Sequence, residues 1–244
     1  MSRKLHLRTR KTHRYLGLFI GIQFLFWTIG GLYFSWNNMK DVHGKTLLDK
    51  SEHTFAFKFN EPVRKLLGVI KEPIKNIEGV VVNQDSLLRV ETVSKNYLLT
   101  LSNRVYAIKD SLTKDQISSF VKSRLKEEIS IRKVSLLTKE NVAKDHEYRE
   151  KPLPVYVVEL EHSTNTKVYV HPQLAKITSV RNDNWRRFDF LWMLHVMDFE
   201  TRDHITNWTL RIFSVLGLAT ILSGFYLFYL SSPTIRRIKK KNNS

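Results

Sequence analysis

An uncharged run of twenty-five residues, 15–39, constrains this chain more than any other feature of its sequence. It reads YLGLFIGIQFLFWTIGGLYFSWNNM. A helix rises about 1.5 Å per residue, so about 20 apolar residues cross a hydrocarbon core of roughly 30 Å. Because lipid offers no hydrogen-bond partners, the backbone groups of such a run must pair within the segment, as they do in a helix. The sequence therefore predicts a transmembrane helix over residues 15–39.

A cleavable signal peptide is the alternative interpretation, because a basic segment precedes the run. Signal-peptide cores hold about 7–15 apolar residues and end at a cleavage site of small residues. Here the run is longer, and it ends in the bulky sequence LYFSW at residues 32–36. We therefore expect a retained membrane anchor.

A second uncharged stretch, residues 212–235, lies near the other end of the chain, and we place the second transmembrane helix at 208–232. The net charge is +17, and eleven positive charges lie within residues 1–14 and 212–244, which contain no acidic residue. Basic flanks beside apolar helices mark the cytoplasmic side of a membrane. We therefore expect cytoplasmic tails at both ends, the second at 233–244, and an extracytoplasmic domain between the two spans.

The same charge distribution argues against a nucleic-acid-binding protein, because the excess lies beside the spans, where a lipid bilayer with anionic headgroups attracts it. The chain has no cysteine, which excludes disulfides, thiolate chemistry, iron–sulfur clusters and zinc–cysteine sites. It also has no HExxH motif, phosphate-binding loop or nucleophile elbow. We leave enzymatic activity open and favour a chain that is not an enzyme on its own.

Residues 40–184 are predicted to form the extracytoplasmic domain. Asn60 and Pro62 fit the start of an amphipathic helix, and Thr113 with Gln116 fits the capping box of a second one. Each helix precedes β-like runs that are separated by turn-forming residues. Helices followed by antiparallel strands give a membrane-anchored α+β fold with two helix-plus-sheet units. We interpret these units as candidate repeats, residues 54–111 and 112–181.

The second unit carries the clearest β pattern. Residues 155–161 alternate in polarity, residues 163–166 favour a turn, and residues 167–171 form the partner strand of a hairpin. Residues 131–137 are predicted to form a further strand. The charged residues 138–154, which end in Pro-Leu-Pro, are predicted to form a loop.

Residues 185–207 are predicted to form an interfacial segment. Aromatic rings with neighbouring arginines are typical of the membrane–water interface. Within the sequence WRRFDFLWMLHVMDF, five ring-bearing residues are predicted to lie near one helical face: Trp185, Phe188, Trp192, His195 and Phe199.

Three segments carry a resemblance to a known family. The hairpin YVVEL…TKVYVHPQLAKI, following a capped helix, resembles the PepSY domain. The sequence RKTHRYLGLFIG at the first span, and FDFLWMLHVMDF with LGLATILSGFYLF near the second, resemble PepSY-associated transmembrane proteins. Larger members of that family have four or more spans, and some are associated with iron uptake and haem-mediated reduction across the membrane. The resemblance implies a bacterial inner-membrane protein with a periplasmic central domain.

The resemblance also implies that His13 and His195 are candidate ligands of haem b, because both match histidines of the family's transmembrane motifs. Histidine pairs are common axial ligands of haem iron. The alternative is that His13 belongs to the basic flank and His195 is an interfacial side chain. Twenty-five helical residues span about 37 Å, so we expect the two histidines at opposite membrane faces, unable to hold one haem within one chain. A homo-oligomer or a larger membrane complex could pair each histidine with its copy.

Several other residues are weaker candidates. His204 lies half a helical turn out of phase with His195, and His162 and His171 border the hairpin without forming a convincing metal site. Asn207 begins a glycosylation sequon but fits a helix N-cap better. Small residues let membrane helices approach closely, and the candidates for helix packing are Gly17, Gly21, Ser214, Gly217 and Gly224.

Two functions from different classes remain. The first is an accessory subunit of transmembrane electron transfer or iron acquisition, with bis-histidine haem in an oligomer. The second is a non-catalytic module that is anchored in the membrane and binds or regulates a partner through its PepSY-like domain.

Overall fold

A computed structural model describes residues 3–49, 51, 53–101, 107–143, 145–202 and 204–233, with the side chains from Leu7 onward. The chain divides into two compact units. One, the helical hairpin, joins the first helix, up to Trp36, to the residues from Phe188 onward. The other, the α+β domain, comprises Asn37–Arg187.

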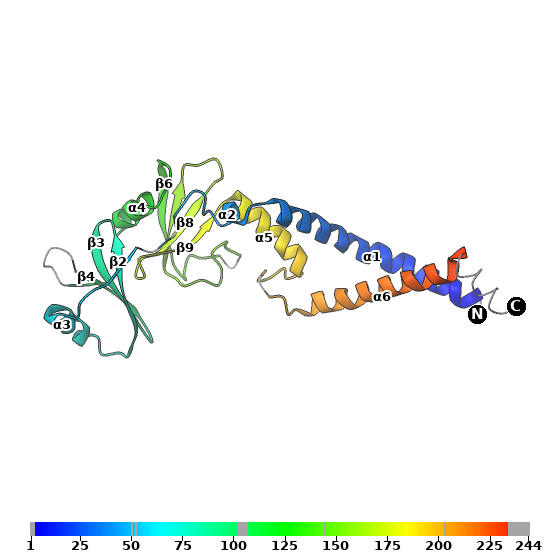
Figure 1. Ribbon diagram of the computed structural model, residues 1–244, viewed down its shortest axis with the longest axis horizontal. Helices are drawn as coiled ribbons and strands as arrows, with labels where there is room; N and C mark the ends of the chain where they lie inside the picture. Colours follow the sequence, from blue (N-terminus) through cyan, green and yellow to red (C-terminus); the bar gives the residue numbers. More distant parts are fainter. Residues whose placement is uncertain are drawn as a thin grey trace. The chain divides into compact units, whose positions relative to one another are not determined.

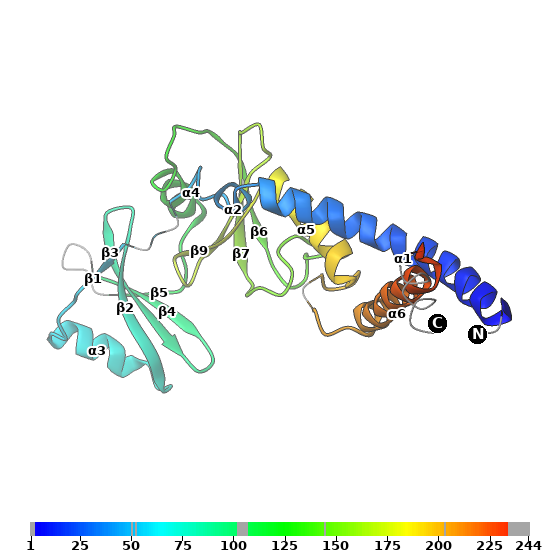
Figure 2. The ribbon, with the colours of Figure 1, turned by 45° about the vertical axis from the view of Figure 1, so that its right-hand side comes forward.

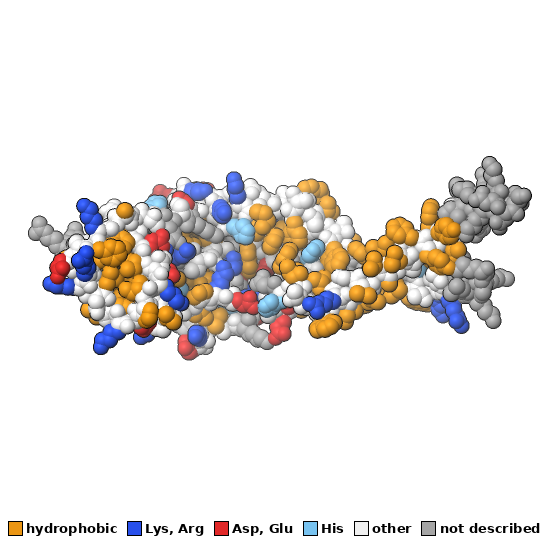
Figure 3. All heavy atoms as spheres, turned by 60° about the horizontal axis from the view of Figure 1, so that its bottom comes forward, with side chains coloured by type: hydrophobic (Ala, Val, Ile, Leu, Met, Phe, Trp, Pro, Cys, Tyr) orange, Lys and Arg blue, Asp and Glu red, His pale blue; other side chains and the backbone are white. Residues whose placement is uncertain are grey.

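Two helices of the hairpin, α1 (Arg3–Trp36) and α6 (Trp208–Ser231), are long and apolar enough to cross a membrane. On the face shown in Figure 3, hydrophobic side chains cover this part of the chain. The structure thus has the two helices that the sequence predicts, each long and apolar enough for a membrane span. Asn207 caps α6, since its Oδ1 accepts the backbone N–H of Leu210 at 2.8 Å.

The bounds of the first span differ from the prediction of residues 15–39. The helix already begins at Arg3, because Lys and Arg are good helix formers and continue the apolar segment backward. It ends at Trp36, because the extended Asn38 caps the short helix α2 (Met39–Val42) by accepting the N–H of Lys40. The tail predicted at 233–244 lies outside the described residues, apart from Pro233.

The predicted interfacial segment forms a separate helix, α5 (Asp183–Val196). Asn182 begins it by accepting the N–H of Trp185 at 2.7 Å. The placement of Phe199 on the same helical face is wrong. The helix stops at Val196 because Met197 takes a left-handed backbone conformation with φ 55°, which breaks the helical hydrogen-bond pattern.

The first half of the α+β domain is an antiparallel sheet in the order β1-β2-β3-β4-β5, with helix α3 (Figures 1 and 2). Asn60 caps α3 with Pro62 in its first turn, as predicted. β5 follows residues 102–106, which lie outside the described residues. The elements are β1 (Thr54–Phe55), α3 (Glu61–Val69), β2 (Ile74–Val82), β3 (Asp85–Thr92), β4 (Asn96–Thr100) and β5 (Ala107–Lys109).

The second half repeats this order with α4 and a sheet β6-β7-β8-β9. The strand at 131–137 and the hairpin are confirmed. The pattern did not predict β9, because its residues mix polar and apolar types, KITSVR. Both halves thus place a helix before an antiparallel meander, and their descent from one repeat stays a prediction. The elements are α4 (Lys114–Lys122), β6 (Ile131–Leu137), β7 (Val155–Leu160), β8 (Lys167–His171) and β9 (Lys176–Arg181).

The largest hydrophobic core joins the two halves of the domain. Ile117, Phe120 and Val121 of α4 pack in one cluster with side chains of both sheets, among them Leu98 and Val158. A second cluster holds α3 on the first sheet. Helix α4 therefore lies where the two halves meet, which positions the residues that follow its last turn.

Thr113→Ala is expected to lower the free energy of unfolding by about 1 kcal/mol. The Thr113 side chain accepts the N–H of Gln116, and the Gln116 side chain accepts the N–H of Thr113, which completes the predicted capping box. Urea unfolding of the chain in detergent, followed by circular dichroism, measures the loss. Thr113→Ser keeps the acceptor and should unfold like the wild type. Equal stability of all three proteins would contradict this role of the cap.

Candidate functional site in the helical hairpin

Helices α1 and α6 pack along each other through rings and small residues. Phe19 and Phe213 lie with ring centroids 5.2 Å apart, and a Cβ built on Gly217 would contact Phe24 at 3.8 Å. In contrast, a Cβ on Gly17 or Gly21 would meet nothing within 4 Å. Within the described part of the chain these two glycines therefore serve no packing contact, and their use against a second chain stays a prediction.

His13 of α1 contacts α6 at Ser223 and Gly224. Its Nδ1 lies 2.8 Å from the Ser223 hydroxyl oxygen, and that hydroxyl lies 2.8 Å from the carbonyl oxygen of Thr220. A hydroxyl has one hydrogen, and a carbonyl oxygen can only accept. The Ser223 hydroxyl therefore donates to Thr220 and accepts from His13, which assigns the proton of the neutral imidazole to Nδ1.

This tautomer leaves the Nε2 of His13 with a free lone pair. Histidines that ligate metals almost always donate the other ring N–H to an acceptor, which fixes the ring and raises the basicity of the ligand nitrogen. Gly224 contributes space, because a Cβ at this position would lie 3.1 Å from Cε1 of His13. The hydrogen bond from Nδ1 to Ser223 therefore holds the His13 ring as expected for a metal ligand or a proton acceptor.

His195 lies in α5, in a cluster of aromatic rings. The rings of Trp27, Phe34 and Trp192 have centroids 5.6, 6.2 and 5.9 Å from its own. Trp27 also donates its indole N–H to the backbone carbonyl of His195 at 2.9 Å. The Nδ1 of His195 is buried with no hydrogen-bond partner among the described residues.

The two histidines lie closer together than the expected 37 Å, because α5 folds back along α1. The side chain of Gln23 donates to the carbonyl of Leu194 at 2.8 Å, and Trp27 contacts His195. Trp27 follows His13 by 14 residues, which corresponds to about 21 Å along a helix. An imidazole–metal bond is about 2 Å long, so two axial nitrogens lie about 4 Å apart. Among the described side chains, one chain still offers one histidine at each level rather than a pair.

His204 belongs to the loop between α5 and α6, so its phase relative to His195 on one helix is not relevant. Its Nδ1 lies 2.7 Å from the hydroxyl of Thr201. Burial alone would raise the pKa of Asp198, but hydrogen bonds from Thr201 and from backbone N–H groups, that of His204 among them, lower it well below its usual range. Asp198 therefore organises this loop as an anion.

The remaining candidates do not form a metal site. His162 bonds Thr164 at 2.7 Å, and burial lowers the pKa of His171, which keeps that ring neutral. Within the part of the chain that the structure describes, no three histidine, aspartate or glutamate side chains gather as metal ligands.

Sequence reasoning missed Ser223 and an apolar groove of about 260 Å³ between α1 and α6. The groove is lined by Ile20, Phe24, Phe213 and Leu218, with Gln23 at its polar side. A serine in an apolar helix carries no local signal for its partner, which lies 210 residues away. Its place next to Gly224, one of the predicted packing residues, is the signal that was available.

Comparisons with protein-family models, with curated proteins and with solved structures found no match to this chain.

Proposed function

We propose that this chain is an accessory subunit in electron transfer across a bacterial inner membrane, in the context of iron acquisition, and that it binds haem in a homo-oligomer. The single observation that carries the proposal is His13, whose Nδ1–H is held by Ser223 and whose Nε2 is left as a free lone pair inside an apolar helix pair.

His13 and His195 are the two residues that would hold haem, each at a different level of the helical hairpin. His13 supplies a supported ligand nitrogen at one level, and His195 supplies an imidazole among aromatic rings at the other. A second copy of the chain would supply the opposite ligand at each level. A haem bound in this way supplies one-electron transfer, and the chain's own part is to fix the ring orientation and to exclude water with the apolar side chains around it.

The test is the absorption spectrum of the protein, expressed with ample haem and purified in detergent. We expect a Soret band that disappears as the oligomer dissociates. His13→Ala and His195→Ala should each remove one class of haem, and Ser223→Ala should weaken binding at the His13 level by about 10–100-fold. His204→Ala, in an exposed loop, is the control and should leave the spectrum unchanged. A colourless wild-type protein, or a coloured monomer, would contradict this proposal.

The proposed orientation places both ends of the chain in the cytoplasm and residues 37–187 outside it. The support is the excess of Lys and Arg beside the two spans. A reporter that is active only in the cytoplasm should be active when it is fused after Ser244. A reporter inserted within the loop at 138–154 should show the opposite behaviour. An extracytoplasmic signal from the fusion after Ser244 would refute this orientation.

The second candidate is a non-catalytic binding module that is anchored in the membrane and acts through its PepSY-like domain. The observation that favours it is the α+β domain itself, in which one core joins both halves. A colourless protein that still associates with other membrane components would favour this candidate.

A further inference from the structure

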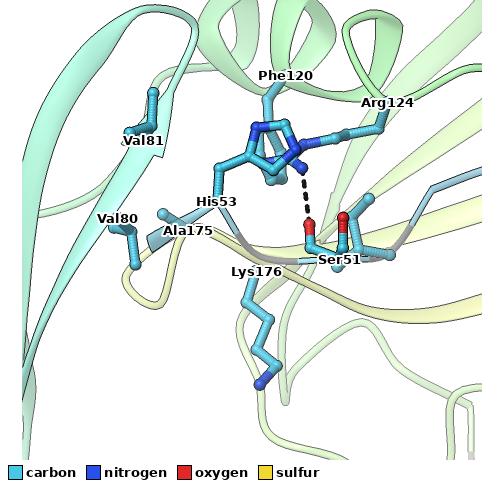
Figure 4. A pocket seen from close by; sticks show the side chains of 9 residues that line it. Ser51, His53, Val80, Val81, Phe120, Arg124, Ala175 and Lys176 are labelled. Carbon is cyan, nitrogen blue, oxygen red and sulfur yellow. Dashed lines mark hydrogen bonds between the residues drawn. The ribbon is translucent and has the colours of Figure 1, made fainter. Parts of the chain in front are cut away.

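A buried arginine lies at the junction of the two halves of the α+β domain. Arg124 follows the last turn of α4 and is 5% exposed. Its guanidinium lies over the ring of Phe120, 5.2 Å from the centroid, and its Nη1 donates to the carbonyl oxygen of Ser51 at 2.6 Å (Figure 4). A guanidinium has five N–H donors, so this single bond uses a small part of its capacity.

Arg124 has no carboxylate within ion-pairing distance in the described part of the chain. The nearby Asp49 accepts the N–H and the hydroxyl of Ser51 at 2.9 Å each, and its carboxylate interacts with the charge of Arg124 at longer range, without a hydrogen bond between them. Buried charges in proteins are normally paired, since an unpaired one loses its hydration without compensation. Among the described residues of this domain, the other buried arginine is Arg89, which follows the rule and pairs with Glu78 at 2.5 Å.

The guanidinium borders a small cavity. The space holds about 10 Å³, which is the room that one oxygen-sized atom or water needs. Figure 4 shows His53 next to Arg124 at this cavity, which Val80 and Ala175 also line. The cavity is therefore built from both halves of the domain, and the side chains of Arg124 and His53 both border it.

The surroundings of the cavity are positively charged. A larger, open cavity of about 530 Å³ shares Ser51 with the first one. Lys40, Lys45 and Lys126 line it, against the single acid Asp49. Such a surface attracts anions and raises their local concentration.

From the buried Arg124 and the cavity beside it, we propose that this site binds a carboxylate. A carboxylate oxygen accepts charge-assisted hydrogen bonds from a guanidinium, and the imidazole of His53 is a further donor. The cavity of about 10 Å³ has room for one oxygen of the carboxylate and not for a whole tetrahedral anion such as phosphate. The carboxylate comes from an acidic side chain or the carboxyl terminus of a polypeptide that docks where the two halves meet.

The test uses the full chain in detergent and saturation-transfer NMR on N-acetylglycine, with its neutral amide as the matched probe. We expect transfer to the acid alone, reduced about tenfold or more in Arg124→Gln. Arg124→Lys keeps the charge without the fork and should bind weakly. Lys114→Gln, which removes a charge at the other end of α4, is the control and should bind like the wild type. Thermal unfolding of each variant verifies that it is folded.

Two peptides then identify the source of the carboxylate. One has an internal glutamate and an amidated end, and the other has a free carboxyl terminus and no acidic side chain. Competition by either supports the site and names its ligand. Equal transfer to the amide, unchanged transfer in Arg124→Gln, or displacement by phosphate as effective as by the peptides would overturn the proposal. None of these readouts depends on haem, so the outcome is independent of the proposed function.

Discussion

Replacing Glu147 with leucine is expected to lower the free energy of unfolding by about 3 kcal/mol, because it leaves the buried Tyr169 and the half-buried Arg186 without their acceptor. Glu147 lies in the loop between β6 and β7 with its side chain 16% exposed. Its carboxylate accepts Nε of Arg186 at 2.8 Å and Nη2 at 3.3 Å, and also the hydroxyl of the fully buried Tyr169 at 2.7 Å. Urea unfolding in detergent measures the change.

The acid dependence of stability separates the charge of Glu147 from its shape. Burial alone would raise the pKa of Glu147, but hydrogen bonds from Arg186 and Tyr169 and the charge of Lys167 lower it below the ordinary value of 4.5. A carboxyl whose pKa is lowered in the folded state contributes stability that is present above its unfolded pKa and is lost as the pH falls through the folded pKa. Glu147→Gln should therefore be less stable than the wild type near pH 7, and the difference should shrink below about pH 4.5.

An exposed ion pair provides the control for both measurements. Glu61 and Lys65 of α3 lie 3.6 Å apart with side chains 72% and 76% exposed. Glu61→Gln should change stability by less than about 1 kcal/mol at any pH, since surface pairs contribute little. A loss at Glu147 no larger than at Glu61 would show that the buried network does not stabilise the domain.

The elements that sequence patterns predicted correctly are those with a local physical signal. The apolar run predicted α1, and the capping residues Asn60 and Thr113 predicted the starts of α3 and α4. Alternating polarity predicted the hairpin of β7 and β8. In each case the residues that determine the element lie within a few positions of one another.

The features that the sequence did not reveal depend on contacts between distant segments. Ser223 fixes the proton of His13 across 210 residues, and Trp27 meets His195 only because α5 returns along α1. Residues 138–154 were correctly predicted to form a loop, but charge alone did not show that Glu147 is buried by β8 and α5. Arg124 likewise looked like one basic residue among many. The candidate sites therefore emerged from packing, whereas the elements that carry them emerged from local patterns.

Gly44→Ala is expected to lower the free energy of unfolding by about 2–4 kcal/mol, through two independent effects. Gly44 has φ +67°, a left-handed conformation that costs an L-residue roughly 1–2 kcal/mol. A Cβ at this position would also lie 2.5 Å from Cγ1 of the buried Val180 of β9, so the core would have to shift. The same substitution at Gly68 in α3 meets nothing within 4 Å and has no positive φ, so it should stabilise the chain by about 0.5–1 kcal/mol. Urea unfolding of both variants in detergent tests the opposite signs. Equal effects of the two substitutions would mean that neither the backbone conformation nor the contact with Val180 constrains residue 44.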